Sequence, residues 1–210
     1  MKDQKAALRE CAETLRHQRP HSWEEFPDFP LYMDQLLAYI NNQQIITADD
    51  DDGLTAAMVN NYTKSGLVPR AEGKKYSRDH IAYLTAVCTL KHALAARDLD
   101  LLLREELRGE SNVEQGYRRL CRTLDRVLNE ISGEMDDVSG RLSLADGAIH
   151  FAVLSYAAAV AGSRYLTLLK EEKAEELAEE RQRELEAKEL KKQSRRSAKK
   201  KKSEDEETHE

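Results

Sequence analysis

The sequence predicts a mainly α-helical protein. Apolar residues recur at the three- and four-residue spacing of amphipathic helices through most of the chain. Only four prolines occur among 210 residues, and three of them precede Leu31, so long stretches are free to be helical. Charged residues make up 34% of the chain and aromatic residues 6%, which is typical of a soluble helical protein. A chain of this length can bury a core without disulfides or metal.

Residues 1–30 are predicted to form a short amphipathic helix followed by an extended linker. Leu8, Cys11 and Leu15 lie at helical spacing, which indicates a helix that docks on the rest of the protein. Each proline between residues 19 and 30 disfavours helix in the residue before it. We expect the aromatic residues of the linker to anchor it across the core; they are Trp23, Phe26 and Phe29.

A first helix is predicted from Leu31, and a short, well-delimited helix follows it after Gly53. Met33, Leu36, Leu37 and Ile40 give the first helix one apolar face. In the second helix, Thr55 is a good N-cap, since its hydroxyl can accept from a backbone N–H of the first turn. Gly66 lies where a left-handed residue ends a helix at least cost, and Pro69 prevents it from resuming.

The second helix is predicted to have an apolar face and a polar face. Leu54, Met58, Val59 and Tyr62 form the apolar side. The polar stripe has i, i+3, i+4 and i+7 spacing and consists of Ala57, Asn60, Asn61 and Lys64. Asparagine can bond bidentately to adenine, and lysine can reach guanine or a phosphate. The stripe therefore has side chains suited to the DNA major groove.

A basic, turn-rich segment and another capped helix come next. Gly73 is the expected tip of the turn, and basic residues stand on both sides of it, at Arg70, Lys74 and Lys75. Ser77 is predicted to cap a helix that begins at Arg78. The apolar face of that helix contains Ile81, Leu84, Val87 and Cys88.

These parts together resemble a known DNA-binding unit. GLTAAMVNNYTKSGLVP followed by KKYSRDHIAYL is similar to the winged helix-turn-helix unit of MerR-type regulators, with a capped recognition helix, a Gly-Leu-hydrophobic-Pro turn and a basic wing ending in Tyr-Ser. Among narrower families, the chain resembles the bacterial domain-of-unknown-function family 1836 from about Phe29 to Tyr165. FPLYMDQLLAYIN and TAVCTLKHALAARDL strengthen that match. The narrower family implies a fold but brings no established activity.

The resemblance implies that residues 31–97 form a MerR-like winged helix-turn-helix unit that binds double-stranded DNA. Asn60, Asn61 and Lys64 would touch base edges, with Thr55 near a phosphate. The basic residues of the wing would grip the backbone; they are Arg70, Lys74, Lys75 and Arg78. Residues 54–80 contain five basic and two acidic side chains, so this segment has a net positive charge. The whole chain, by contrast, has a formal charge of −6. The acidic run at residues 48–52 is interpreted as a solvated loop.

Residues 98–169 are predicted to form a helical bundle. Asp98 can cap a short helix that closes near Gly109, and residues 111–114 have the spacing of a capping box for a helix ending at Gly133. Residues 136–141 are expected to form a loop. The inward face of the longer helix would contain Tyr117, Leu120, Cys121, Leu124, Val127, Leu128 and Ile131.

A further capping pattern at residues 143–146 starts a helix whose residues 148–162 are apolar almost all round. Such a helix is normally central and buried, so we expect a bundle core; a homodimer seam is the alternative. His150 within it is expected to be a satisfied core histidine, and the apolar run is too short for a comfortable membrane span.

Residues 170–210 are predicted to form a solvated charged helix and a disordered tail. Opposite charges recur at i, i+4 in this region, but the leucines make no sustained coiled-coil repeat. The basic run at residues 195–202 could hold a phosphate backbone, and a solubilising role is the alternative.

The sequence contains no catalytic or metal-binding motif that we can identify. The histidines form no His-x-x-x-His or Glu-x-x-His pair, and Cys11, Cys88 and Cys121 form no Cys-x-x-Cys pair. We therefore expect no enzymatic activity, no cofactor, no metal and no membrane partner. A charged N-terminus without an apolar segment and the scattered cysteines favour the cytoplasm. Two functions remain open: a DNA-binding regulator, or a protein-interaction module on the same scaffold that does not bind DNA.

Overall fold

We describe a computed structural model of the chain. It divides into two compact units, Met1–Leu154 and Ser155–Glu210, each considered by itself. The structure describes residues 2–43, 53–108, 112–175, 178–179, 182–183 and 185–186.

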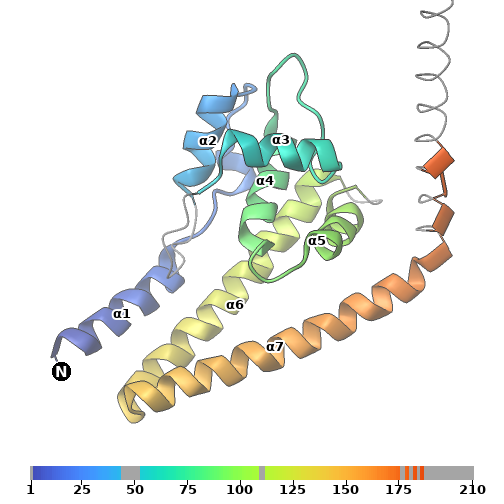
Figure 1. The fold of residues 1–210 in the computed structure, drawn as a ribbon. Coiled ribbons are helices and arrows are strands. Elements are labelled where there is room, and N and C mark those ends of the chain that lie inside the picture. Colours follow the sequence, from blue (N-terminus) through green and yellow to red (C-terminus); the bar gives the residue numbers. More distant parts are fainter. Residues whose placement is uncertain are drawn as a thin grey trace, which may run out of the picture. The chain divides into compact units, whose positions relative to one another are not determined.

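The prediction of a mainly helical protein is confirmed. In chain order, the helices are α1 (Lys2–His17), η1 (Trp23–Glu25), α2 (Met33–Asn41), α3 (Ala56–Ser65), α4 (Arg78–Leu90), α5 (Ala96–Leu103), η2 (Arg104–Arg108), α6 (Val113–Arg141) and α7 (Leu144–Glu172). Figure 1 labels the α-helices on the ribbon. Within the described residues, two isolated antiparallel bridges take the place of strands: Leu31 with Tyr76, and Glu72 with Lys75.

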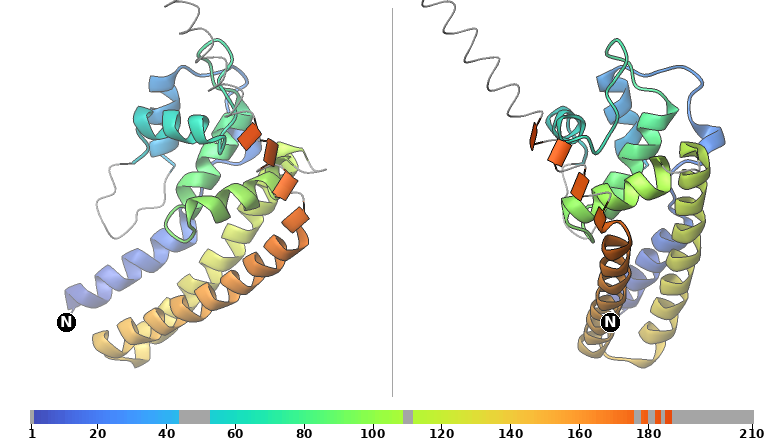
Figure 2. Two further views of the ribbon diagram at one scale, coloured as in Figure 1. Left: turned by 45° about the vertical axis from the view of Figure 1, so that its right-hand side comes forward. Right: turned by 90° about the vertical axis from the view of Figure 1, so that its right-hand side faces the viewer.

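Helix α4 forms the centre of the first unit. Every residue from His80 to Cys88 is buried, so all faces of this helix are covered over that stretch. Helices α2, α5 and α6 pack against it, and α3 packs against α2 (Figure 2). Cys88 is buried among apolar side chains, as the sequence predicted, and forms no disulfide.

The N-terminal helix docks on α6, which confirms the expectation of a docking helix. The Ser132 hydroxyl donates to the Ala12 carbonyl at 3.0 Å, and both residues are buried. Arg19 forms an ion pair with Asp125 at 2.6 Å. Because Ala12 meets Ser132 and Arg19 meets Asp125, the two helices run antiparallel (Figure 1).

The linker between α1 and α2 is anchored by two of the three aromatic residues expected to do so. Phe26 is 2% exposed, and its ring lies 5.0 Å from the ring of Tyr117. Trp23 packs against the same core. Phe29, however, is 65% exposed, so the expectation that it anchors the linker is wrong. The turn η1 ends immediately before Phe26, whose side chain is buried in the core. Phe29 lies three residues further along the linker, where its side chain is exposed.

The break expected in α6 is absent. The helix continues through Gly133 and through residues 136–141, where a loop was predicted. Gly133 has open space around it, and nothing in its surroundings requires a turn. The contacts of α1 with Ser132 and Asp136 hold this part of α6, and tertiary packing of this kind overrides the helix-breaking tendency of a single glycine.

Two helix starts differ from the expected caps. Helix α5 begins one turn earlier than predicted, with Ala95 as the N-cap and Asp98 in its first turn. Asn112 caps α6 by accepting from the Gln115 backbone N–H at 2.9 Å. Ser111, the expected cap, lies outside the described residues.

Helix α7 is not the buried core helix that its composition predicted. None of its most apolar 18-residue stretch is buried, and the helix is long and apolar enough to cross a membrane by length and composition. His150 is half-buried and lies 2.9 Å from the Glu134 carboxylate, so it pairs with α6 rather than with a core. Apolar composition indicates that a helix is more stable when its surface is buried, but it does not specify which other element buries that surface. The predicted basic and acidic tail, residues 195–210, lies outside the described residues.

Candidate nucleic-acid interface

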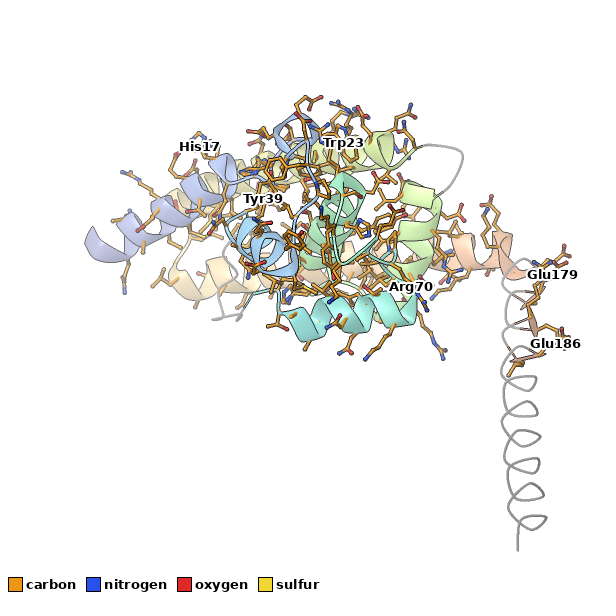
Figure 3. All side chains as sticks on the ribbon, turned by 90° about the horizontal axis from the view of Figure 1, so that it is seen from above. His17, Trp23, Tyr39, Arg70, Glu179 and Glu186 are labelled. Atoms are coloured by element: carbon orange, nitrogen blue, oxygen red, sulfur yellow. The ribbon has the colours of Figure 1, made fainter. Side chains whose placement is uncertain are left out.

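Helix α3 presents the polar stripe predicted from the sequence on its exposed side. Thr55 caps it as expected, with its hydroxyl accepting from the Met58 N–H at 3.3 Å. Val59 is fully buried and holds the opposite face against the core. The stripe of Ala57, Asn60, Asn61 and Lys64 is exposed along its whole length. Figure 3 shows side chains along one face of α3 pointing away from the rest of the molecule.

The start of α3 is fixed to the end of α2 through one side chain. The Asn41 carboxamide oxygen accepts from the Leu54 N–H at 2.7 Å, and its NH₂ group donates to the Leu54 carbonyl at 3.1 Å. Gly53 has φ of 69°, and a Cβ there would lie 2.8 Å from the Asn41 oxygen. Since Leu54 is also buried, this contact sets where α3 begins relative to α2.

The chain reverses sharply after α3. Gly66 is left-handed with φ of 82°, as expected for the helix C-cap. The Val68 N–H then donates to the Tyr62 carbonyl at 3.3 Å, and both Leu67 and Val68 are buried. The turn therefore packs its apolar residues inward and directs the next, basic segment away from the core.

That segment forms a minimal hairpin with Gly73 and Lys74 at its tip. The N–H of Glu72 donates to the Lys75 carbonyl at 3.2 Å, and the N–H of Lys75 returns a bond to the Glu72 carbonyl at 3.0 Å. Gly73 and Lys74 both have positive φ, of 56° and 67°. Two central residues with positive φ are the mark of a type I′ turn, the tightest hairpin connection. Lys74 and Lys75 are exposed on it.

The base of the hairpin is tied to the start of α2. Leu31 and Tyr76 exchange two backbone hydrogen bonds, each 2.9 Å long, and both residues are buried. The Lys75 ammonium lies 5.5 Å from the centre of the Tyr32 ring. A cation over an aromatic face is attracted by the ring quadrupole, so Tyr32 orients Lys75 without neutralising it.

His80 connects the hairpin to α4. Its Nδ1 accepts from the Ser77 backbone N–H at 3.0 Å, and its Nε2 donates to the Arg70 carbonyl at 3.2 Å. These partners assign the neutral tautomer with the proton on Nε2. The ring is 6% exposed and meets the Tyr76 ring edge to face. His80 thereby fixes the backbone from which Arg70 projects.

Arg78 differs from the other predicted contact residues. Its guanidinium donates to the Phe26 carbonyl at 2.8 Å and forms an ion pair with Asp28 at 2.5 Å. The side chain is half-buried, so it holds the linker before α2 onto the start of α4. The remaining predicted contact residues are all exposed: Thr55, Asn60, Asn61, Lys64, Arg70, Lys74 and Lys75.

The structure thus brings seven predicted residues to the surface on two consecutive segments, α3 and the hairpin, and adds two supporting residues that the sequence did not single out. Asn41 and His80 form hydrogen bonds to backbone groups of Leu54 and Arg70, and no sequence motif predicts contacts of this kind. The acidic run at residues 48–52, which could oppose a phosphate backbone, lies outside the described residues. Among the described residues, no group of three or more metal-ligating side chains is close enough to hold an ion.

Comparison with known families supports the narrower resemblance. Residues 21–120 match the family model described as Domain of unknown function (DUF1836). The match contains α2, α3, the hairpin and α4, and also η1, α5 and the first residues of α6. Neither a curated protein nor a solved structure matches the chain significantly.

Proposed function

We propose that the chain is a non-enzymatic, cytoplasmic transcriptional regulator that binds double-stranded DNA through a MerR-like winged helix-turn-helix unit at residues 31–97. The observation that carries the proposal is the exposure of Asn60, Asn61 and Lys64 on a helix whose opposite face is buried. A short, rigid helix with polar side chains on one face matches the dimensions of the major groove.

In this proposal α3 lies in the major groove. Asn60 and Asn61 contact base edges, and Lys64 reaches a guanine or a phosphate from the last turn. Thr55 lies at the helix N-terminus, where backbone N–H groups and the helix dipole favour a phosphate. The hairpin acts as the wing, with Arg70, Lys74 and Lys75 on the phosphate backbone.

The remaining predicted contact, Arg78, receives a different role. Its bonds to Phe26 and Asp28 occupy the guanidinium, so we assign it to holding the linker and α4 in register rather than to gripping DNA. Asn41 and His80 have the same kind of role for α3 and for the hairpin. The DNA contact that the sequence resemblance predicts for Arg78 is not part of this proposal and stays a prediction.

The test is selection of bound genomic fragments by the full chain at low and at physiological salt. We expect one sequence motif to be enriched at both salt concentrations. The variant Lys74→Ala/Lys75→Ala should bind every sequence more weakly, and the slope of log K against log salt should fall by about one to two. Lys5→Ala/Arg9→Ala on α1 removes the same charge from exposed positions and should leave the slope unchanged. An unaltered slope in the hairpin variant would remove the hairpin from the mechanism.

A second candidate function is a protein-interaction module that does not bind DNA. The observation that favours it is the exposed apolar surface of α7, together with the formal charge of −6. Absence of any enriched motif, combined with fragment binding seen only at low salt, would select this second function.

A further inference from the structure

An exposed aromatic side chain lies directly opposite a lysine of the hairpin. Leu31 and Tyr76, which exchange two backbone hydrogen bonds, are both buried. In antiparallel pairing the next residues along the two segments face each other, and here they are Tyr32 and Lys75. Their side chains point to the opposite side from the buried pair. Tyr32 is 51% exposed and Lys75 is exposed, so this outward side carries an aromatic ring and a cation.

The backbone of Tyr32 is fixed before any ligand binds. Its N–H donates to the side-chain oxygen of Gln35 at 3.0 Å, and its carbonyl accepts from the Leu36 N–H at 2.8 Å. The preceding residue, Leu31, is paired with the hairpin. These bonds use backbone groups of Tyr32 and do not involve its hydroxyl. A side chain on a fixed backbone loses little further conformational entropy when it contacts a partner.

The charges beside the ring indicate an anionic partner. The Lys75 ammonium lies 5.5 Å from the centre of the Tyr32 ring. Residues 70–76 contain three basic side chains, Arg70, Lys74 and Lys75, and one acidic side chain, Glu72, and all four are exposed. A phenol hydroxyl is a neutral hydrogen-bond donor, an ammonium is a charged one, and phosphate oxygens accept from both. The ring and the cation together are therefore suited to a phosphate.

We propose that Tyr32 contacts the DNA backbone, with its hydroxyl donating to a phosphate oxygen beside the Lys75 ammonium and its ring holding that ammonium in place. This inference rests on the proposed function, because the hairpin has to lie on a duplex. It adds a contact residue at the start of α2, outside both α3 and the hairpin. The contact carries no sequence information, since phosphates are alike at every base pair.

Fluorescence anisotropy with two labelled duplexes tests the role of the hydroxyl. One duplex is a fragment selected by the full chain, and the other has a mixed sequence. Tyr32→Phe keeps the ring and removes only the hydroxyl, so it should bind both duplexes about three- to tenfold more weakly. The slope of log K against log salt should stay unchanged, because a neutral donor releases no counterion. Lys75→Ala, by contrast, should lower the slope by about one.

A second substitution at the same position tests the role of the ring. Tyr32→Leu removes the ring as well as the hydroxyl, so it should bind more weakly than Tyr32→Phe. Combined with Lys75→Ala, the two substitutions should have equal effects, because the ring then has no cation to hold. A difference between them that persists without the Lys75 ammonium would overturn the role assigned to the ring.

Phe29 provides the matched control. It is an aromatic residue of the same linker and is 65% exposed, but it lies before the pairing of Leu31 with Tyr76. Phe29→Leu should therefore bind both duplexes as the wild type does. Circular dichroism should show that Tyr32→Phe unfolds at the wild-type temperature, because the hydroxyl belongs to an exposed side chain.

The possible outcomes separate this inference from the proposed function. If Tyr32→Phe binds as tightly as the wild type while Lys75→Ala lowers the salt slope, the contact by Tyr32 is overturned and the DNA-binding hairpin stands. Weaker binding of Tyr32→Phe to the selected duplex alone would overturn the phosphate contact in favour of a base contact. Failure of the full chain to bind either duplex would overturn the proposed function, and this inference with it.

Discussion

Asn41 bonds to both backbone groups of Leu54, across the segment that separates the first two helices of the DNA-binding candidate. The carboxamide oxygen of Asn41 accepts from the Leu54 N–H, and its NH₂ group donates to the carbonyl of the same residue. It fixes the residue immediately before the Thr55 cap, and through it the start of α3. The position of the exposed stripe on α3 therefore depends on a side chain of α2 that lies outside the stripe.

Replacing Asn41 with alanine should lower both stability and DNA affinity. Two backbone groups of a buried residue lose their partners, at a cost of about 1–3 kcal/mol. Urea unfolding followed by circular dichroism measures the change. Asn42→Ala removes the exposed neighbouring carboxamide and should cost less than about 0.5 kcal/mol. Equal losses in the two variants would contradict the assigned role of Asn41.

Substitution of the two exposed asparagines of α3 should change sequence preference rather than stability. Asn60→Ala and Asn61→Ala should each cost about 1–3 kcal/mol at the preferred site and relax discrimination at one base position. Binding to a library of single-base variants of the selected site measures the effect. Uniform weakening at every position would assign these residues to phosphates.

Two glycines of α6 should respond in opposite ways to alanine. A Cβ at Gly116 would lie 2.0 Å from the Glu106 carbonyl oxygen, whereas Gly133 has nothing within 4 Å. Gly116→Ala should destabilise the protein by more than about 2 kcal/mol, because α6 and η2 would have to separate. Gly133→Ala should stabilise it by about 0.5–1 kcal/mol through helix propensity. Thermal unfolding of both variants checks the signs.

The stability of the protein should fall in strongly alkaline solution through Tyr117. Burial raises the pKa of its phenol well above the ordinary value near 10, and the hydroxyl donates to the His21 carbonyl at 2.7 Å. Above about pH 10 the unfolded chain loses this proton while the folded chain keeps it. Stability is therefore unaffected by this group below pH 10 and falls by about 1.4 kcal/mol per pH unit above it.

Tyr117→Phe provides the control for this pH dependence. It removes the titrating group and should reduce the alkaline slope, while lowering stability at neutral pH by about 1 kcal/mol through loss of the hydrogen bond to His21. Burial also raises the pKa of Tyr39 and of Tyr76, but both residues remain in the two proteins and cancel in the comparison. Identical alkaline slopes would contradict the role of Tyr117.

Local signals in the sequence predicted the part of the chain around α3 well. Thr55 caps the helix, Gly66 ends it with positive φ, and Val59 is buried opposite the polar stripe, because each of these properties depends on neighbours within one or two turns. The supporting contacts of Asn41 and His80 were not predicted. They join residues to backbone groups 10 or more positions away, and sequence periodicity carries no information on such pairs.

By itself, the sequence determined that the protein is helical, where several of its helices begin and end, and which face of α3 is polar. These are properties of hydrogen bonding and apolar spacing along a single helix. Only the tertiary structure decided that Gly133 continues a helix, that Phe29 is exposed, and that α7 is uncovered. The hydrophobic effect favours the burial of apolar surface but has no directional preference. The composition of α7 therefore indicates that its surface is more stable when buried, and only the packing of the folded chain determines whether another part of the same chain buries it.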